Sequence, residues 1–102
     1  MVWKKIGEAG VDSGQLLICD PCYIDSHWKE EEYTGKGNKK AKNAFSYKAC
    51  CNQTVEGKGY GELGILGTVF STAFGDGCYE IFGNFKKVDG CKRITEVKII
   101  LV

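Results

Sequence analysis

The sequence has a single proline, a single histidine and a single arginine, and it contains no long hydrophobic run. No apolar segment approaches the roughly 20 residues of a membrane-spanning helix, so no membrane span is predicted. Residues 1–5 are not followed by the apolar core of a secretory signal, and we therefore expect a cytoplasmic protein. Neither sign of charge dominates, because the chain contains 14 Lys and Arg residues and 13 Asp and Glu residues. This balance argues against nucleic acid as a partner, although a local basic patch could bind an anion.

The remaining composition is that of a folded domain. With 102 residues, 43% of them hydrophobic and 26% charged, the chain is neither disordered nor collagen-like, and one domain covering residues 1–102 is expected. Six cysteines are many for this length. Because no secretion signal accompanies them, we expect reduced thiols rather than a framework of disulfides.

Alternating, β-branched and aromatic residues predict mostly strands. These strands fall at residues 2–6, 15–19, 44–51, 68–74, 78–88 and 92–102. Residues 15–19 are apolar on both faces, which predicts a central strand, and Ile100 and Val102 predict burial of both faces at the C-terminal end. Asp89-Gly90 predicts a two-residue hairpin. The sum is a mainly β fold, a small antiparallel barrel or sandwich of five or six strands with one short helix.

The predicted helix begins at Asp25 or Ser26, either of which can cap it, and runs to about Tyr33 with Trp28 facing inward. Residues 34–43 form a polar, glycine-containing loop, the segment that we expect to be most mobile. The lysines of this loop are Lys36, Lys39, Lys40 and Lys42. They could bind phosphate or single-stranded nucleic acid, or they could simply be solvated.

The stretch ICDPCYIDSH, residues 18–27, concentrates reactive side chains after a strand that Pro21 ends. Cys22 and His27 could act as nucleophile and base, with Asp20 or Asp25 orienting the imidazole. A thiol enzyme needs that base within hydrogen-bonding reach of the sulfur. The alternative is that the histidine lies on a solvated helix face and the cysteine is an ordinary thiol.

Two arrangements could hold a metal ion. Cys19 and Cys22 form a C-x-x-C pair that Cys50 and Cys51 could complete as a zinc site, but adjacent cysteines on a strand would point to opposite faces. Three carboxylates at predicted strand ends could gather a divalent cation. These are Asp12, Asp20 and Asp76, and each also suits the turn in which it stands. We therefore expect separate thiols and turn-forming aspartates, with no metal and no cofactor.

Residues 59–64 spell G-x-G-x-x-G, which resembles the dinucleotide-binding fingerprint. That fingerprint requires a helix after the glycines, whereas a strand is predicted here. The stretch is therefore interpreted as a linker or bulge.

Two motifs occur together and in order. They are VDSGQLLICDPCYI at residues 11–24 and FGDGCYEIFG at residues 74–83, followed by a final strand at residues 93–102. They resemble the pattern of a family of small, essentially uncharacterised bacterial and phage proteins. The resemblance implies a small β-rich domain and covers the N-terminal quarter and the C-terminal third of the chain. Cys19, Cys78 and Glu80 depart from the family pattern.

Each motif places an aspartate in a sharp turn with a tyrosine three residues later. If the strands are neighbours, Tyr23 and Tyr79 could line a pocket with Asp20 and Asp76 at its rim, suited to a small polar, nucleotide-like ligand. The alternative is that these residues only form corners and turns. We expect a non-enzymatic binding module of phage or mobile-element origin that sequesters such a ligand or blocks a host protein, and that could form homo-oligomers. A small cysteine-dependent hydrolase using Cys22, or a purely structural component, is the alternative.

Overall fold

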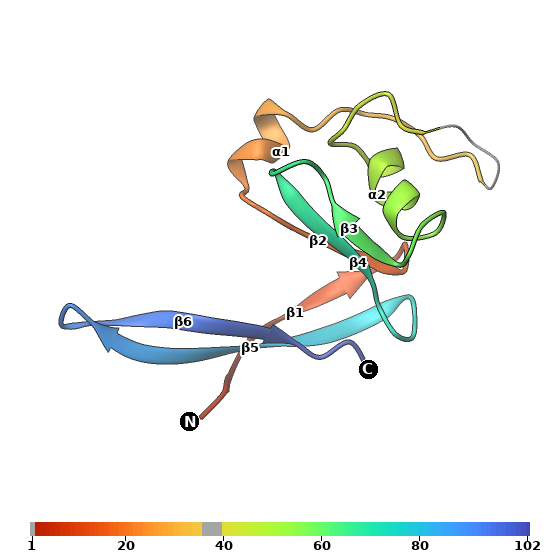
Figure 1. Ribbon diagram of the computed structural model, residues 1–102. Coiled ribbons are helices and arrows are strands. Elements are labelled where there is room, and N and C mark those ends of the chain that lie inside the picture. The colour runs from red at the N-terminus through yellow and green to blue at the C-terminus, as the bar shows by residue number, and fades with distance from the viewer. Residues whose placement is uncertain (1, 36–39) are drawn as a thin grey trace. The chain divides into compact units, whose positions relative to one another are not determined.

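The computed structural model describes residues 2–35 and 40–102, which form six strands and two short helices (Figure 1). The mainly β, antiparallel fold class is confirmed. The described strands form two open three-stranded sheets, so of the two predicted alternatives, barrel or sandwich, the closed barrel is excluded. The chain divides into two compact units, one made of Met1–Gly14 with Thr72–Val102 and the other of Gln15–Ser71. A single domain over residues 1–102 stays a prediction.

The first unit contains the sheet β1-β5-β6, with all neighbours antiparallel. Its strands are β1 (Lys4–Val11), β5 (Gly77–Val88) and β6 (Cys91–Ile99). The predicted hairpin between β5 and β6 is confirmed, because Asp89 and Gly90 have φ angles of 51° and 79°. Two successive positive φ angles are typical of the turn whose twist matches that of the flanking strands.

The second unit contains the sheet β2-β4-β3 and both helices. Its elements are β2 (Gln15–Cys19), α1 (Cys22–Ser26), α2 (Tyr47–Gln53), β3 (Tyr60–Glu62) and β4 (Gly67–Ser71). The core of this unit consists of buried side chains from α2, β4 and the segments beside them. They are Phe45, Ala49, Cys50, Leu63 and Val69. Trp28 packs against this core with its ring edge-on to Phe45 at 5.1 Å, which confirms its predicted inward orientation.

Residues 44–51 do not form the predicted strand, since most of them belong to α2. Ser46 caps this helix: its hydroxyl accepts a hydrogen bond from the backbone N–H of Ala49 at 3.1 Å. Phe45 lies just before the cap, and Ala49, Cys50 and Cys51 are buried along the helix. The cap and the helical spacing of these small buried residues outweigh the short polar–apolar alternation.

The predicted helix from residue 25 to residue 33 is also wrong. The chain turns helical earlier, at Cys22, directly after Pro21, and α1 ends at Ser26. Proline suits the start of a helix because its φ angle is already helical, and the Asp20 carboxylate accepts from the backbone N–H of Cys22 at 3.0 Å. The following segment is extended, with Lys29 forming a single bridge to Ser46.

Two predictions about burial are corrected as well. β2 is an edge strand rather than a central one, because β4 lies in the middle of its sheet, and Ile18 is 56% exposed. The C-terminal end is not buried on both faces, since Ile100 and Val102 are both exposed. In each case some hydrophobic residues of an apolar run remain exposed, because the unit does not bury all of them.

Candidate functional site

The four residues predicted to share a pocket have partners within their own units. In the second unit, Tyr23 is half-buried against the core, and Asp20 caps the start of α1. In the first unit, the buried Tyr79 donates its hydroxyl to the carbonyl of Gly75 at 2.7 Å, and Asp76 accepts from the backbone N–H of Gly14 at 2.9 Å. These bonds give each residue a structural role as a turn or corner. A ligand role for the four stays a prediction.

The geometry around Cys22 disfavours thiol chemistry. The hydrogen bond from its thiol to the Asp20 carboxylate raises the pKa of Cys22 above its ordinary value, so less of the nucleophilic thiolate forms at neutral pH. The backbone and thiol bonds from Cys22 in turn lower the pKa of Asp20. His27 is exposed and pairs through Nδ1 with the Ser26 hydroxyl at 2.7 Å, with its ring edge-on to Tyr23.

All six cysteines are free thiols. Cys50 lies in the core of the second unit, where burial raises the pKa of its thiol to about 11, and Cys51 is buried beside it on α2. Over residues 2–35 and 40–102, no three His, Cys, Asp or Glu side chains gather in a way that could hold a metal ion.

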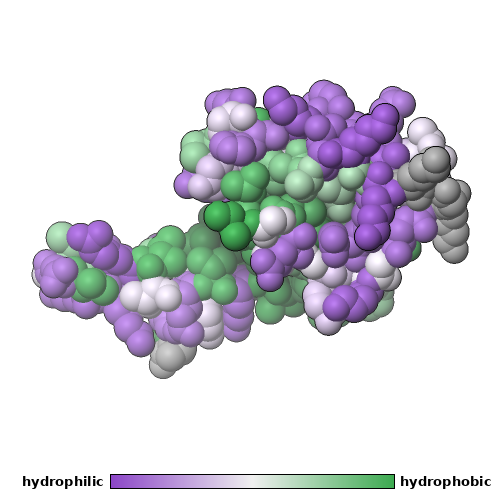
Figure 2. Space-filling model, turned by 45° about the horizontal axis from the view of Figure 1, so that its top comes forward, coloured by the Kyte–Doolittle hydropathy of each residue, from purple (hydrophilic) through white to green (hydrophobic). Residues whose placement is uncertain are grey.

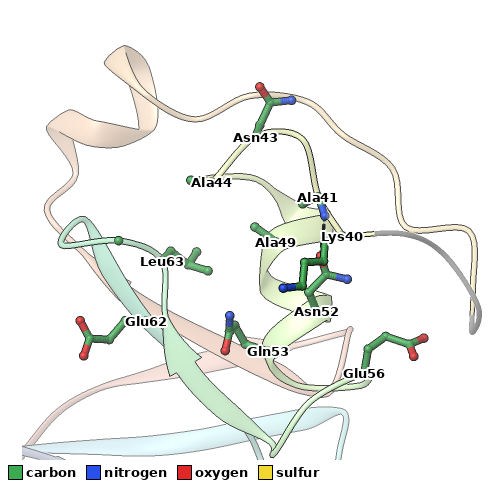
Figure 3. Close-up of a pocket in the computed structure, with 11 residues that line it drawn as sticks. Lys40, Ala41, Asn43, Ala44, Ala49, Asn52, Gln53, Glu56, Glu62 and Leu63 are labelled. Atoms are coloured by element: carbon green, nitrogen blue, oxygen red, sulfur yellow. Dashed lines mark hydrogen bonds between the residues drawn. The ribbon is translucent and has the colours of Figure 1, made fainter.

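A pocket of about 510 Å³ lies in the second unit, between α2 and the turn that links β3 to β4 (Figure 3). Its apolar surface comes from small aliphatic side chains, with Leu63 pointing toward Ala49 on α2 and Ala44 nearby. This size lies within the range of ligand pockets, about 300–1,000 Å³. The volume is enough for a small ring-bearing molecule.

Three amide side chains line this pocket. They are Asn43, Asn52 and Gln53. Asn52 Oδ1 accepts from the backbone N–H of Ala41 at 2.7 Å, so its NH₂ group is the end that can donate to a ligand. Gln53 lies between α2 and β3, where Gly61 leaves space for its amide: a Cβ at Gly61 would overlap Gln53 Oε1. One wall therefore offers both donors and acceptors.

Charged groups stand at the same pocket. Lys40, Glu56 and Glu62 are all exposed lining residues. Glu56 is held by the hydroxyl of Tyr33, and this hydrogen bond raises the pKa of Tyr33 to about 12. The carboxylates suit ligand hydroxyl or amine groups, and the lysine suits an anionic group. Of the other loop lysines, Lys36 and Lys39 lie outside the described residues, as does the part of the predicted mobile loop between them.

Glu31 organises the chain segment that carries Asn43. Its carboxylate accepts from the backbone N–H groups of Lys42 at 2.8 Å and Asn43 at 3.0 Å, and also from the Ser46 hydroxyl at 3.3 Å. Those two backbone bonds are the main reason why the pKa of Glu31 is lowered. One carboxylate thus connects the loop beside the pocket to the cap of α2.

We expect Glu31→Gln to lower the thermal stability of the protein near neutral pH, with the difference from wild type shrinking under acid. The folded state depresses this pKa, so the carboxylate stabilises the fold above the ordinary value of 4.5, and that stabilisation is lost as pH falls through the folded value. Melting temperatures measured from pH 7 to pH 3 test this. Glu32→Gln, at an exposed neighbouring position, is the control and should not reproduce this dependence. A constant deficit at every pH would contradict the assignment.

The glycine-rich stretch 59–64 contains β3 and the start of its turn to β4. The segment after these glycines is a strand, as predicted, and not the helix that a dinucleotide-binding fingerprint requires. The interpretation of the stretch as a linker or bulge is wrong for Tyr60–Glu62, which form β3. Within this stretch, Gly61 allows the side chain of Gln53 to approach the backbone closely.

No protein-family model, curated protein or solved structure matches the chain. None of the described helices has the length and apolarity needed to cross a membrane.

Proposed function

We propose that the chain is a non-enzymatic binding module that takes up a small polar, ring-bearing ligand of nucleotide-like chemistry in the pocket between α2 and β3. The observation that carries this proposal is the combination of an aliphatic surface with amide groups in one pocket of about 510 Å³. A heterocycle can lie against the side chains of Ala41 and Ala44, which are at least partly exposed in the lining. The edge of its ring can then exchange hydrogen bonds with Asn52 and Gln53.

Lys40 extends this interpretation toward ligands that carry phosphate. Its ammonium group is a compact point charge at the rim, and an ammonium group of this kind is a common partner of phosphate oxygens. The exposed carboxylate of Glu62 could accept from sugar hydroxyls. Such a module could serve a phage or mobile element in the cytoplasm by sequestering the ligand, and copies of the chain could associate in doing so.

Binding rather than catalysis is proposed because the strongest nucleophile candidate is poorly activated. The hydrogen bond to Asp20 raises the pKa of Cys22, which is the opposite of what a catalytic thiol needs. The partly buried polar side chains that line the pocket are amides, whereas its charged side chains are exposed. A blocked host protein remains the alternative partner within the same proposal.

We expect Gln53→Met to abolish ligand binding with little loss of stability, because methionine keeps the length of the side chain and removes its amide. A thermal-shift screen against nucleosides, nucleoside monophosphates and cyclic nucleotides measures this. Wild type should melt at a higher temperature with one ligand class, since a ligand at 100 times its Kd adds about 2.7 kcal/mol. The variant should show no such shift.

Gln15→Met is the matched control. Gln15 is not a lining residue of the pocket, and its side chain accepts a hydrogen bond from the Thr54 hydroxyl at 2.8 Å. This variant should therefore lose stability and retain the ligand-induced shift. If wild type responds to none of the compounds, or if Gln53→Met responds as wild type does, the proposal fails.

A further inference from the structure

The end of the β5–β6 hairpin is a two-stranded ribbon. β1 pairs with β5 only as far as Gly83, whereas β5 and β6 continue to pair out to Val88 and Cys91. Figure 1 shows this hairpin extending past the end of β1. We define residues 85–94 as the arm. Its residues from 86 to 94 are all exposed, so both faces of the ribbon meet solvent.

The arm places like charges directly opposite each other on both faces. Lys86 pairs with Arg93, and Lys87 pairs with Lys92. Because successive residues of a strand point to opposite faces, one of these pairs lies on each side of the ribbon. Like charges at directly opposed positions destabilise a sheet. Two such pairs in succession are costly for the isolated protein and are relieved by an anionic partner.

Acidic groups near the arm do not cancel this charge. Residues 85–94 contain four basic side chains and one acidic side chain, Asp89, which stands in the turn. Glu96, at the base of the arm, accepts from the Asn84 amide at 2.7 Å. Over residues 2–35 and 40–102, the ion pairs are those of Lys5 with Glu8 and with Glu80. Figure 2 shows hydrophilic residues interspersed with hydrophobic ones along the arm, at the left of the view.

A hollow of about 470 Å³ lies where the arm joins the rest of its sheet. Lys4, Lys86 and Lys92 line it together with Phe85, and no acidic residue is among the described residues of its lining. The ammonium group of Lys92 lies over the Phe85 ring, 5.4 Å from its centroid. These lysines continue the basic surface from the arm onto β1.

We propose that the arm binds duplex DNA by inserting into a groove, with its two basic faces contacting the phosphates of the two groove walls. A two-stranded ribbon fits the major groove of B-form DNA. Basic side chains on both faces of the ribbon match the phosphates on both walls of the groove. Single-stranded nucleic acid would need a basic surface on only one face of the ribbon. The contacts are made to the backbone, so binding is independent of sequence. The overall charge of +1 hides this local surface, which is why the sequence argued against nucleic acid.

Fluorescence anisotropy of a labelled 20-base-pair DNA duplex, measured between 50 and 200 mM salt, tests this inference. Four phosphate contacts predict that log K falls with log salt with a slope of about 3.6 in magnitude. The double variant Lys86→Gln/Lys87→Gln should halve that slope and weaken binding about tenfold for each lysine removed near 0.1 M salt. The control Lys29→Gln/Lys58→Gln changes the total charge equally, at exposed positions outside the arm, and should bind as wild type does.

Misfolding is separated from loss of contacts by the melting temperature. The arm variant removes a like-charge pair on each face, so it should melt at or above the temperature of wild type while binding more weakly. Wild type that fails to bind the duplex at 50 mM salt overturns the inference. So does an equal loss in the control variant, or binding to single-stranded DNA, double-stranded RNA or anionic phosphatidylserine vesicles that is as strong as binding to the duplex.

Discussion

Phe45→Ala is expected to lower the free energy of unfolding by about 3–5 kcal/mol, the cost of truncating a buried aromatic residue. Phe45 is 3% exposed in the core of the second unit, and its ring meets Trp28 edge-on at 5.1 Å. It also lies directly before Ser46, which caps α2. The substitution therefore removes core volume at the start of the helix that carries the pocket amides. Chemical denaturation monitored by tryptophan fluorescence measures the loss.

Phe74→Ala provides the matched control, because Phe74 is 77% exposed in the first unit. We expect its unfolding free energy to lie within about 0.5 kcal/mol of wild type, as for most surface substitutions. Equal losses of unfolding free energy in the two variants would contradict the placement of Phe45 in the core.

Gly67→Ala should destabilise the second unit by about 1–3 kcal/mol, in the range of overpacked sites. A Cβ at Gly67 would lie 2.8 Å from the backbone carbonyl oxygen of Ile18 and 3.0 Å from Leu17 Cδ1. Because the nearest atom is backbone, β2 must move away from β4 to make room, which strains the Cys19–Gly67 end of their ladder. Thermal unfolding should show a lower melting temperature.

Gly10→Ala tests whether this effect comes from the close approach rather than from the loss of a strand glycine. A Cβ at Gly10, in β1, would meet no atom within 4 Å. This variant should be neutral or slightly stabilising, since alanine reduces the freedom of the unfolded chain. If Gly67→Ala is as well tolerated as Gly10→Ala, β2 and β4 do not approach as described.

The strands could be predicted well where the pattern and the turn chemistry agreed. Asp89-Gly90 and the β-branched run of β4 each predicted one structure, and each prediction is confirmed. At residues 44–51 the apolar alternation competed with a capping serine, and a pattern of eight residues is too short to separate a strand from a helix. The signal that could have identified α2 was Ser46, because serine is a favoured residue at the start of a helix, where its hydroxyl accepts from the backbone N–H three residues later.

Burial was harder to predict than secondary structure, because it depends on neighbours that lie far away in the sequence. β2 is apolar along its whole length, yet its position at the edge of the sheet leaves Ile18 exposed. The order β2-β4-β3 is set by pairing between distant segments. A single sequence carries no direct record of that order.

The candidate pocket could not be predicted for the same reason. Asn52 and Gln53 lie at the end of α2, in a stretch directly after the residues predicted as a strand, and Leu63 comes from the glycine-rich stretch beyond it. The motif residues Asp20 and Tyr79 attracted attention through their sharp turns, and hydrogen bonds within the chain account for those turns. The motifs therefore indicated turns of the chain. The asparagine and glutamine residues of the pocket belong to no motif in the sequence, so nothing in the sequence distinguished them.

The most direct test of the central proposal is a ¹H–¹⁵N NMR titration of the ¹⁵N-labelled protein with a pool of nucleoside monophosphates and cyclic nucleotides. We predict saturable chemical-shift changes centred on the backbone and side-chain amides of Asn52 and Gln53, extending to Leu63. A spectrum that does not change would contradict the proposal, and so would changes centred on Tyr23 or Tyr79 instead of the pocket.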